Sequence, residues 1–347
     1  MSRIDLTSVT AWITVAAQQH GNALATRVAE RLGVTRRSSQ FLLGKLVAAQ
    51  WLCRSGTLRR PVYRPGALKQ VVQRYALAGL QEDLPWARDF APFFDLPANV
   101  TRLAQHAFTE LLNNAVDHSG GGSVTVSMRQ TPLHLQLLVS DDGCGLFERI
   151  QQSFAIDNPT LAMLELGKGK LTSQPERHLG HGLFFTSRLA DMFDLHANQA
   201  AFQFRGWDRR CWVAGKPMAR RGTSIYLGIA IDTQRTLDDV MRSHSTDARG
   251  YAFETTSVPL ALMTDARSGL ESRAQARRAT ARLQDFRCAE LDFTGIADLG
   301  HGFADELFRV FVRAHPDLDL RPVGMTPRVA AMVASASASA SSAAATA

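Results

Sequence analysis

The sequence ELLNNAVDHS at residues 110–119 decides how the middle of the chain is interpreted. With the residues just before it, it predicts one amphipathic helix, because apolar positions recur three and four residues apart. These positions are Ala104, Ala107, Phe108, Leu111, Leu112, Ala115 and Val116. Glu110, Asn114 and His118 recur every four residues and form a polar stripe beside that apolar face. On spacing alone, the stripe is either an ordinary surface row or one shared site.

The residues after this helix predict two antiparallel strands and a glycine-rich loop. SVTVSMR and LHLQLLVS alternate apolar and polar residues with a period of two. The second strand leads into DDGCG at residues 141–145. An aspartate at a strand end can accept a hydrogen bond from an exocyclic amine, and glycines let a flat ring approach the backbone. This loop therefore predicts a site for a nucleotide base.

A second glycine-containing motif follows at residues 178–191, HLGHGLFFTSRLAD. Gly180 and Gly182 stand directly before an apolar helix, whose free amide groups and positive dipole end favour phosphate oxygens. The segment GTSIYLGIAI then predicts a strand with Thr223 at its start. Base, phosphate and strand motifs thus follow the helix in order.

In this order the motifs resemble the GHKL superfamily of ATP-binding domains, found in gyrase, a heat-shock chaperone, histidine kinases, mismatch-repair proteins and anti-sigma-factor serine kinases. ELLNNAVDHS resembles the N box, DDGCG the first glycine box, GHGLFF the second, and GTSIYL the closing strand. The resemblance covers residues 98–232 and implies an α/β sandwich of the GHKL (Bergerat) type. It also implies ATP and Mg²⁺ as ligands.

The resemblance implies roles for individual residues. Asn114 would ligate Mg²⁺, Glu110 would be the catalytic group that activates the attacking nucleophile, and Asp141 would bind the adenine amino group. The first glycine pair would line the base, the second pair would contact the phosphates, and Thr223 would support Asp141 through water. The implied nucleotide-binding set is Asn114, Asp141, Gly143, Gly145, Gly180, Gly182, Thr223 and Lys170.

Residues 147–179, between the two glycine boxes, would form a flexible lid. Its candidates to neutralise the triphosphate are Lys168, Lys170, Arg177 and His178. A run such as GKGK is also what a solvated loop contains. It is not a Walker P-loop, because the glycine required five positions before Gly-Lys is absent.

The first 66 residues form a basic segment. They hold ten Lys and Arg against two Asp and Glu, a larger excess than the +7 of the whole chain. Apolar spacing predicts helices at residues 7–19, 23–32 and 36–49, with Gly33 ending the second and Thr35 capping the third, and a hairpin carrying Arg59 and Arg60 would follow. With ALATRVAERLGVTRRSSQFLLGKLVAAQWL, this segment resembles the winged helix of bacterial regulators, in which the hairpin is the wing.

This module has two open interpretations. In the first, the third helix enters the major groove of duplex DNA while wing cations neutralise phosphates. The residues that would contact DNA are Arg36, Arg37, Ser39, Gln40, Lys45, Arg59 and Arg60. In the second, the module serves dimerisation or partner docking and its arginines are merely solvated.

The rest of the chain predicts a connector, a third domain and a tail. Residues 67–97 would be a linker helix in a proline-rich connector, and residues 250–333 alternate strands and helices as a small α/β domain. ELDFTGIADLGHGFADELFRVF resembles a STAS-like domain of unknown function. STAS domains of partner-switching systems are phosphorylated on a serine or threonine at the start of the helix after such a strand. The matching stretch here is Gly300-His301-Gly302, which has no hydroxyl. Asp305 and Glu306 would cap that helix or dock a basic surface, and residues 334–347 would be disordered.

The fold class is therefore multidomain α+β: a winged helix, a GHKL domain and a STAS-like domain. With 45% hydrophobic and 20% charged residues, no apolar run long enough for a membrane span and no signal peptide, we expect a cytoplasmic protein that needs no membrane. One hypothesis is an ATP-binding regulator that contacts DNA. The other is a serine/threonine kinase, or an ATPase, that acts on a separate regulatory protein. A conventional histidine kinase is disfavoured, because His106 precedes an alanine and lies within the N box helix.

Overall fold

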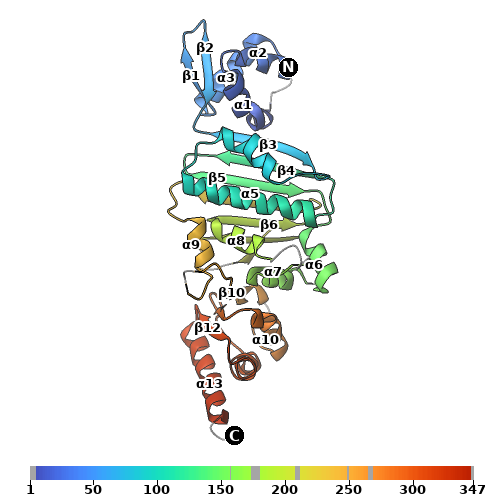
Figure 1. The fold of residues 1–347 in the computed structure, drawn as a ribbon, viewed down its shortest axis with the longest axis vertical. Helices are drawn as coiled ribbons and strands as arrows, with labels where there is room; N and C mark the ends of the chain where they lie inside the picture. Colours follow the sequence, from blue (N-terminus) through green and yellow to red (C-terminus); the bar gives the residue numbers. More distant parts are fainter. Residues whose placement is uncertain are drawn as a thin grey trace. The chain divides into compact units, whose positions relative to one another are not determined.

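The computed structural model describes residues 5–156, 158–172, 180–207, 212–247, 250–264 and 269–344, with side chains as far as residue 338 (Figure 1). The chain divides into two compact units. The first comprises Met1–Gly143 and Ser224–Gln234, and the second comprises Cys144–Thr223 and Arg235–Ala347. Both units combine helices with sheets, as the predicted multidomain α+β class requires.

Helices open the first unit at the predicted positions, namely α1 (Leu6–His20), α2 (Leu24–Leu32) and α3 (Arg36–Ala48). Gly33 ends α2 with φ of 63°, a left-handed conformation that costs glycine nothing. Thr35 caps α3, because its hydroxyl accepts a 3.2 Å hydrogen bond from the amide of Ser38. Buried side chains of all three helices, including Ile13 and Leu43, form one core.

An antiparallel hairpin follows, made of β1 (Leu52–Gly56) and β2 (Pro61–Pro65). Arg59 and Arg60 lie in the turn between its strands, as predicted, and both are exposed. The amide of Tyr63 donates to the carbonyl of Gly21 at 3.0 Å, which attaches the hairpin to the end of α1. The close approach requires glycine, since a Cβ at Gly21 would lie 2.4 Å from the Tyr63 carbonyl oxygen.

The predicted connector needs a correction, because Lys69–Ala76 forms strand β3. This strand pairs antiparallel with β4 (Ser123–Gln130), and its Gln70 amide donates to the Thr14 hydroxyl of α1 at 3.0 Å. A short segment with one buried face becomes a strand only when a partner strand satisfies its backbone, and that partner lies about fifty residues away in sequence. The remaining connector holds the short helical pieces α4 (Asp83–Pro85), η1 (Trp86–Phe90) and η2 (Ala91–Phe93).

The sheet of the first unit has the order β3-β4-β5-β9, with β5 (His134–Asp141) and β9 (Thr223–Ala230) also antiparallel. Helix α5 (Ala98–His118) lies across it in Figure 1 and packs on β5. Every predicted inward position of α5 is buried except Val116, which is half-buried. The Phe108 ring meets Trp86 and Phe90 edge to face, with centroids 5.4 and 5.1 Å away.

The second unit begins with helices and with antiparallel strands in the order β6-β7-β8, which belong to the same seven-stranded sheet order β3-β4-β5-β9-β6-β7-β8. Its helices are α6 (Leu146–Phe154), α7 (Pro159–Lys168), α8 (Gly182–Leu189) and α9 (Leu237–Arg242), and its strands are β6 (Met192–Ala197), β7 (Ala200–Arg205) and β8 (Val213–Ala214). The predicted lid therefore contains two regular helices, α6 and α7. Asn158 caps α7 by accepting from the Thr160 amide at 2.8 Å.

A parallel sheet of order β10-β11-β12 forms the rest of the second unit. Its elements in chain order are β10 (Thr255–Pro259), η3 (Leu260–Met263), α10 (Arg273–Thr280), η4 (Leu283–Asp285), β11 (Cys288–Asp292), α11 (His301–Asp305), η5 (Glu306–Phe311), α12 (Val312–Ala314), β12 (Asp319–Val323) and α13 (Pro327–Ala344). The predicted alternation of strands and helices is confirmed, although the first strand begins at Thr255 rather than at the predicted domain start, residue 250.

The prediction of a disordered tail is wrong for residues 334–344, because α13 continues to Ala344; residues 345–347 lie outside the described residues. Low sequence complexity does not prevent a helix here. Alanine has the highest intrinsic helix propensity, and an existing helix extends at the cost of only one residue at a time.

Candidate functional site

The end of α5 and the first glycine loop pack directly on each other in the first unit. A Cβ at Gly143 would lie 2.2 Å from the carbonyl oxygen of Ser119, which follows the last residue of α5. The Ser119 hydroxyl donates to the Ala115 carbonyl at 2.6 Å and accepts from the Gly121 amide at 3.1 Å. Only glycine fits position 143, so the predicted base-binding loop is fixed against the helix that carries the polar stripe.

The two aspartates of this loop have different surroundings. Asp141 is buried at the end of β5, and its carboxylate accepts a 2.9 Å hydrogen bond from the Gly143 amide. Asp142 faces the other way and accepts from the amides of Gly122 and Ser123 at 2.8 and 2.9 Å and from the Ser123 hydroxyl at 2.6 Å. These hydrogen bonds, that of the Ser123 side chain above all, lower the pKa of Asp142 to about 2. Asp142 thus holds the loop while Asp141 remains the candidate ligand.

The polar stripe of α5 lies at the border of the core, as the spacing predicted. Glu110, Asn114 and His118 are each half-buried, on successive turns of one helix. One turn before them, His106 has a buried Nε2 without a hydrogen-bond partner, and burial lowers its pKa. The imidazole of His106 is therefore neutral near pH 7, and Glu110 is the carboxylate of this stripe.

In the second unit, Asn198 links two segments that lie far apart in the sequence, at Cys144 and at Gly222. Its Nδ2 donates to the Cys144 carbonyl at 2.8 Å, and its Oδ1 accepts from the Gly222 amide at 2.9 Å. Gly145 has φ of 95°, and a Cβ there would lie 2.5 Å from Asn198 Nδ2. Thr223 follows Gly222 and is half-buried at the start of β9. Asn198 was missed in the sequence, because a single asparagine in a turn between strands carries no motif.

The second glycine box starts α8 as predicted. Gly182 is the first residue of α8, and Gly180 has φ of 69°. A Cβ at Gly180 would lie 2.8 Å from the backbone of Leu171, so this position also accepts glycine alone. Between the glycines, His181 meets the Phe253 ring edge to face at 4.9 Å, and burial and the nearby Lys170 charge lower its pKa.

The lysines of the predicted lid have partners outside the glycine boxes. Lys170 Nζ donates to the Asp285 carbonyl at 2.6 Å and lies 4.3 Å from the centre of the Phe286 ring. Lys168 is fully buried and pairs with Glu165. The structure therefore places Lys170, the predicted phosphate ligand, against the C-terminal part of the second unit. Arg177 and His178 lie outside the described residues.

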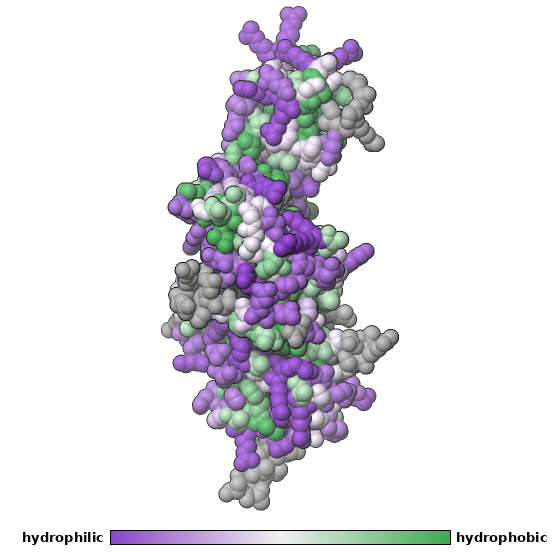
Figure 2. Space-filling model, turned by 90° about the vertical axis from the view of Figure 1, so that its right-hand side faces the viewer, coloured by the Kyte–Doolittle hydropathy of each residue, from purple (hydrophilic) through white to green (hydrophobic). Residues whose placement is uncertain are grey.

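The predicted DNA-contacting residues of the N-terminal module are exposed, with one exception. The exposed members of the set are Arg36, Arg37, Gln40, Lys45, Arg59 and Arg60. Ser39 is 0% exposed, and its hydroxyl donates to the carbonyls of Ala25 and Arg36 at 2.8 and 3.0 Å. It ties α3 to α2, so its inclusion among the DNA contacts is corrected. Hydrophilic side chains project from this module in the space-filling view (Figure 2).

At the start of α11, Gly300 of the stretch that lacks an acceptor hydroxyl has no room for a side chain. A Cβ at Gly300 would lie 2.3 Å from a carboxylate oxygen of Glu271 and 2.7 Å from its Cα. The carboxylates that follow are engaged within the same part of the chain. Asp305 pairs with Arg309 at 2.5 Å, and Glu306 accepts from Arg277 at 2.7 Å. A basic surface that docks on these carboxylates would therefore have to displace or share existing ion pairs.

Comparison with known protein families identifies two of the predicted domains. Residues 99–232 match the family of histidine kinase-, DNA gyrase B- and HSP90-like ATPases, and residues 275–330 match a STAS-like domain of unknown function. The chain thus contains a GHKL-type ATPase domain and a STAS-like domain, as the motifs had indicated. No curated protein matches the chain.

No helix in the described part of the chain is long and apolar enough to span a membrane.

Proposed function

We propose that this protein is a cytoplasmic ATP-binding regulator, in which Mg²⁺-ATP bound by residues 99–232 is coupled to the N-terminal module and to the STAS-like domain. The single observation that carries the proposal is the GHKL-type ATPase match over residues whose loops accept only glycine. A Cβ at Gly143 or Gly180 would overlap neighbouring backbone, and a Cβ at Gly145, where φ is 95°, would overlap the side chains of Asn198 and Glu148. Loops of this kind let a ligand meet backbone groups directly.

The donor set fits the nucleotide. Mg²⁺ prefers phosphate oxygens and water with few protein ligands, so the amide oxygen of Asn114 suffices as the protein ligand. The Asp141 carboxylate, oriented by the Gly143 amide, would accept a hydrogen bond from the adenine amino group. Bound Mg²⁺ would supply charge neutralisation at the phosphates. Glu110, one turn before Asn114, would accept the proton of an attacking nucleophile.

Duplex DNA is the proposed partner of the N-terminal module. Exposed cations on α3 and on the hairpin turn suit a groove-and-backbone contact, because phosphates need accessible positive charge. Two exposed apolar side chains, Phe41 at 68% and Leu58 at 86%, lie on α3 and on the same turn. They also suit the competing hypothesis of dimerisation or protein docking. Titration of a labelled duplex at several salt concentrations separates the two, since only DNA binding gives a steep salt slope.

The second candidate function is a serine/threonine kinase that acts on a separate regulatory protein. The half-buried Glu110 beside Asn114 favours it, because a domain that only binds ATP needs no general base. The close-packed Gly300 argues against an acceptor at the start of α11 of the same chain.

The deciding experiment follows the γ-phosphate of labelled ATP in wild type, Asn114→Ala and Glu110→Ala. Transfer or release that Glu110→Ala abolishes while ATP still binds supports the kinase or ATPase. If wild type binds ATP without turnover and Asn114→Ala no longer binds ATP, the result supports an ATP-binding regulator. Absence of ATP binding by the wild-type protein contradicts both.

A further inference from the structure

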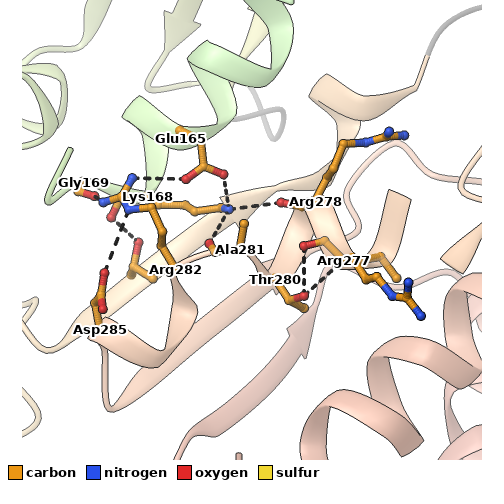
Figure 3. Close-up of polar contacts among 11 residues, drawn as sticks. Glu165, Lys168, Gly169, Arg277, Arg278, Thr280, Ala281, Arg282 and Asp285 are labelled. Carbon is orange, nitrogen blue, oxygen red and sulfur yellow. Dashed lines mark hydrogen bonds and ion pairs between the residues drawn. The ribbon is translucent and has the colours of Figure 1, made fainter. Parts of the chain in front are cut away.

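A lysine from the segment between the glycine boxes is buried against the STAS-like domain. Lys168, the last residue of α7, is 0% exposed. Its Nζ lies 2.5 Å from a Glu165 carboxylate oxygen and donates to the carbonyls of Ala281 and Arg278 at 2.8 and 3.3 Å (Figure 3). Burial of an ammonium group is costly unless it is paired and hydrogen-bonded, and Lys168 meets one carboxylate oxygen and two carbonyl oxygens. The Lys168 side chain is therefore part of a buried, fully hydrogen-bonded contact and not part of a solvated loop.

The carbonyls that Lys168 meets belong to the end of α10. The last carbonyls of a helix have no partner within the helix and carry its negative dipole end. Arg278 lies in the last turn of α10, and Ala281 is its C-terminal flanking residue. The ammonium group of Lys168 thus caps α10 from α7, which attaches a helix of the ATPase domain to a helix of the STAS-like domain.

Arg282 closes the contact from the opposite side. Its NH1 lies 3.1 Å from the second carboxylate oxygen of Glu165, and its NH2 donates to the Gly169 carbonyl at 3.0 Å (Figure 3). The Thr256 hydroxyl adds a 2.6 Å hydrogen bond to the Lys168 carbonyl. We call Glu165, Lys168 and Arg282 the α7–α10 charge cluster. It fixes both the side chain and the backbone at the end of α7.

Lys170 is held by the same domain, through the Asp285 carbonyl and the Phe286 ring. Both lysines of the GKGK run therefore use carbonyl oxygens of residues 278–285 as partners. The run lies in sequence between the two glycine boxes of the ATPase domain. While the STAS-like domain is docked, the ammonium groups of these lysines donate hydrogen bonds to its carbonyl oxygens. In that state they are not available to a phosphate.

We propose that the STAS-like domain competes with nucleotide for this lysine run, so that the α7–α10 charge cluster couples ATP binding to release of α10. The proposal rests on ATP binding by residues 99–232. Coupling between two ligands of one element is reciprocal: if the docked STAS-like domain weakens ATP binding, then ATP weakens docking by the same factor. Loosening the cluster from the STAS-like side should therefore tighten ATP binding.

The test uses the full-length chain and a matched pair of substitutions. Arg282→Gln removes the guanidinium that joins Glu165 and Gly169, whereas Arg278→Gln removes an exposed guanidinium of the same region that contributes only its backbone carbonyl. We expect Arg282→Gln to lower the Kd for Mg²⁺-ATP about 5-fold or more, the lower end of typical allosteric couplings. Arg278→Gln should leave the Kd at the wild-type value. If Arg282→Gln does not fold, Arg282→Asn is the substitute, because asparagine tolerates the φ of 62° at this position.

Hydrogen exchange gives an independent readout of the same coupling. In wild type, saturating Mg²⁺-ATP should speed exchange of amides in residues 278–286 several-fold, and in Arg282→Gln these amides should already exchange fast without nucleotide. An unchanged or weaker affinity in a folded Arg282 variant, with wild type still binding ATP, overturns the coupling and leaves the proposed function standing. Failure of wild type to bind ATP overturns both.

Discussion

Removing the carboxylate of Glu165 should destabilise the second unit strongly. The substitution Glu165→Ala leaves the ammonium of Lys168, which is fully buried, without its counterion and beside the like charge of Arg282. Breaking a buried ion pair on one side costs about 3–5 kcal/mol, far more than the gain from an exposed pair. Each kcal/mol lowers Tm by about 2–4 °C in a domain of about 150–250 residues, so the expected shift is on the order of 10 °C.

Differential scanning calorimetry measures this shift in Tm. Two further variants serve as controls. Asp319→Ala removes a carboxylate from an exposed pair with Arg321 and should cost no more than about 1 kcal/mol. The double variant Glu165→Ala, Lys168→Met should recover most of the loss, because it leaves no uncompensated buried charge. A Glu165→Ala shift no larger than that of Asp319→Ala would show that Lys168 does not need Glu165 as its counterion.

Burial lowers the pKa of His244 to about 4, so between about pH 6.5 and 4 the imidazole is protonated in the unfolded chain but not in the folded one. The free energy of unfolding should therefore fall by about 3 kcal/mol as the pH falls through this range. Urea titrations measure this pH dependence, which should be weaker in His244→Phe. Gly143→Ala should abolish ATP binding and cost about 1–3 kcal/mol, since its Cβ would overlap the Ser119 carbonyl; wild-type affinity in a titration would contradict this. Arg37→Ala should weaken duplex binding in anisotropy titrations and lower the salt slope by about one, whereas Ser39→Ala should lower Tm without changing that slope.

The sequence predicted those elements whose pattern is local. Helix α5 and strands β4 and β5 follow from periodicity, and Thr35 and Gly33 mark helix ends through chemistry that acts within three residues. The glycine boxes were also found locally, because the backbone conformations of Gly145 and Gly180 favour one residue type.

What the sequence did not predict depends on partners far away in the chain. Strand β3 exists because β4 pairs with it, and Asn198 acts through carbonyl and amide groups of two distant loops. Lys168 resembled a solvated lysine, yet its carbonyl partner Ala281 is more than a hundred residues later. The buried Ser39 was assigned to the exposed face of α3 because small polar residues occur on both faces of a helix.

Calorimetric titration of Mg²⁺-ATP into the full-length protein and into Asp141→Ala tests the nucleotide site itself. We expect saturable binding at one site per chain by wild type, and loss of that binding in a folded Asp141→Ala variant. Wild-type affinity in Asp141→Ala, or no binding by the wild-type protein, would contradict the assignment of the nucleotide site.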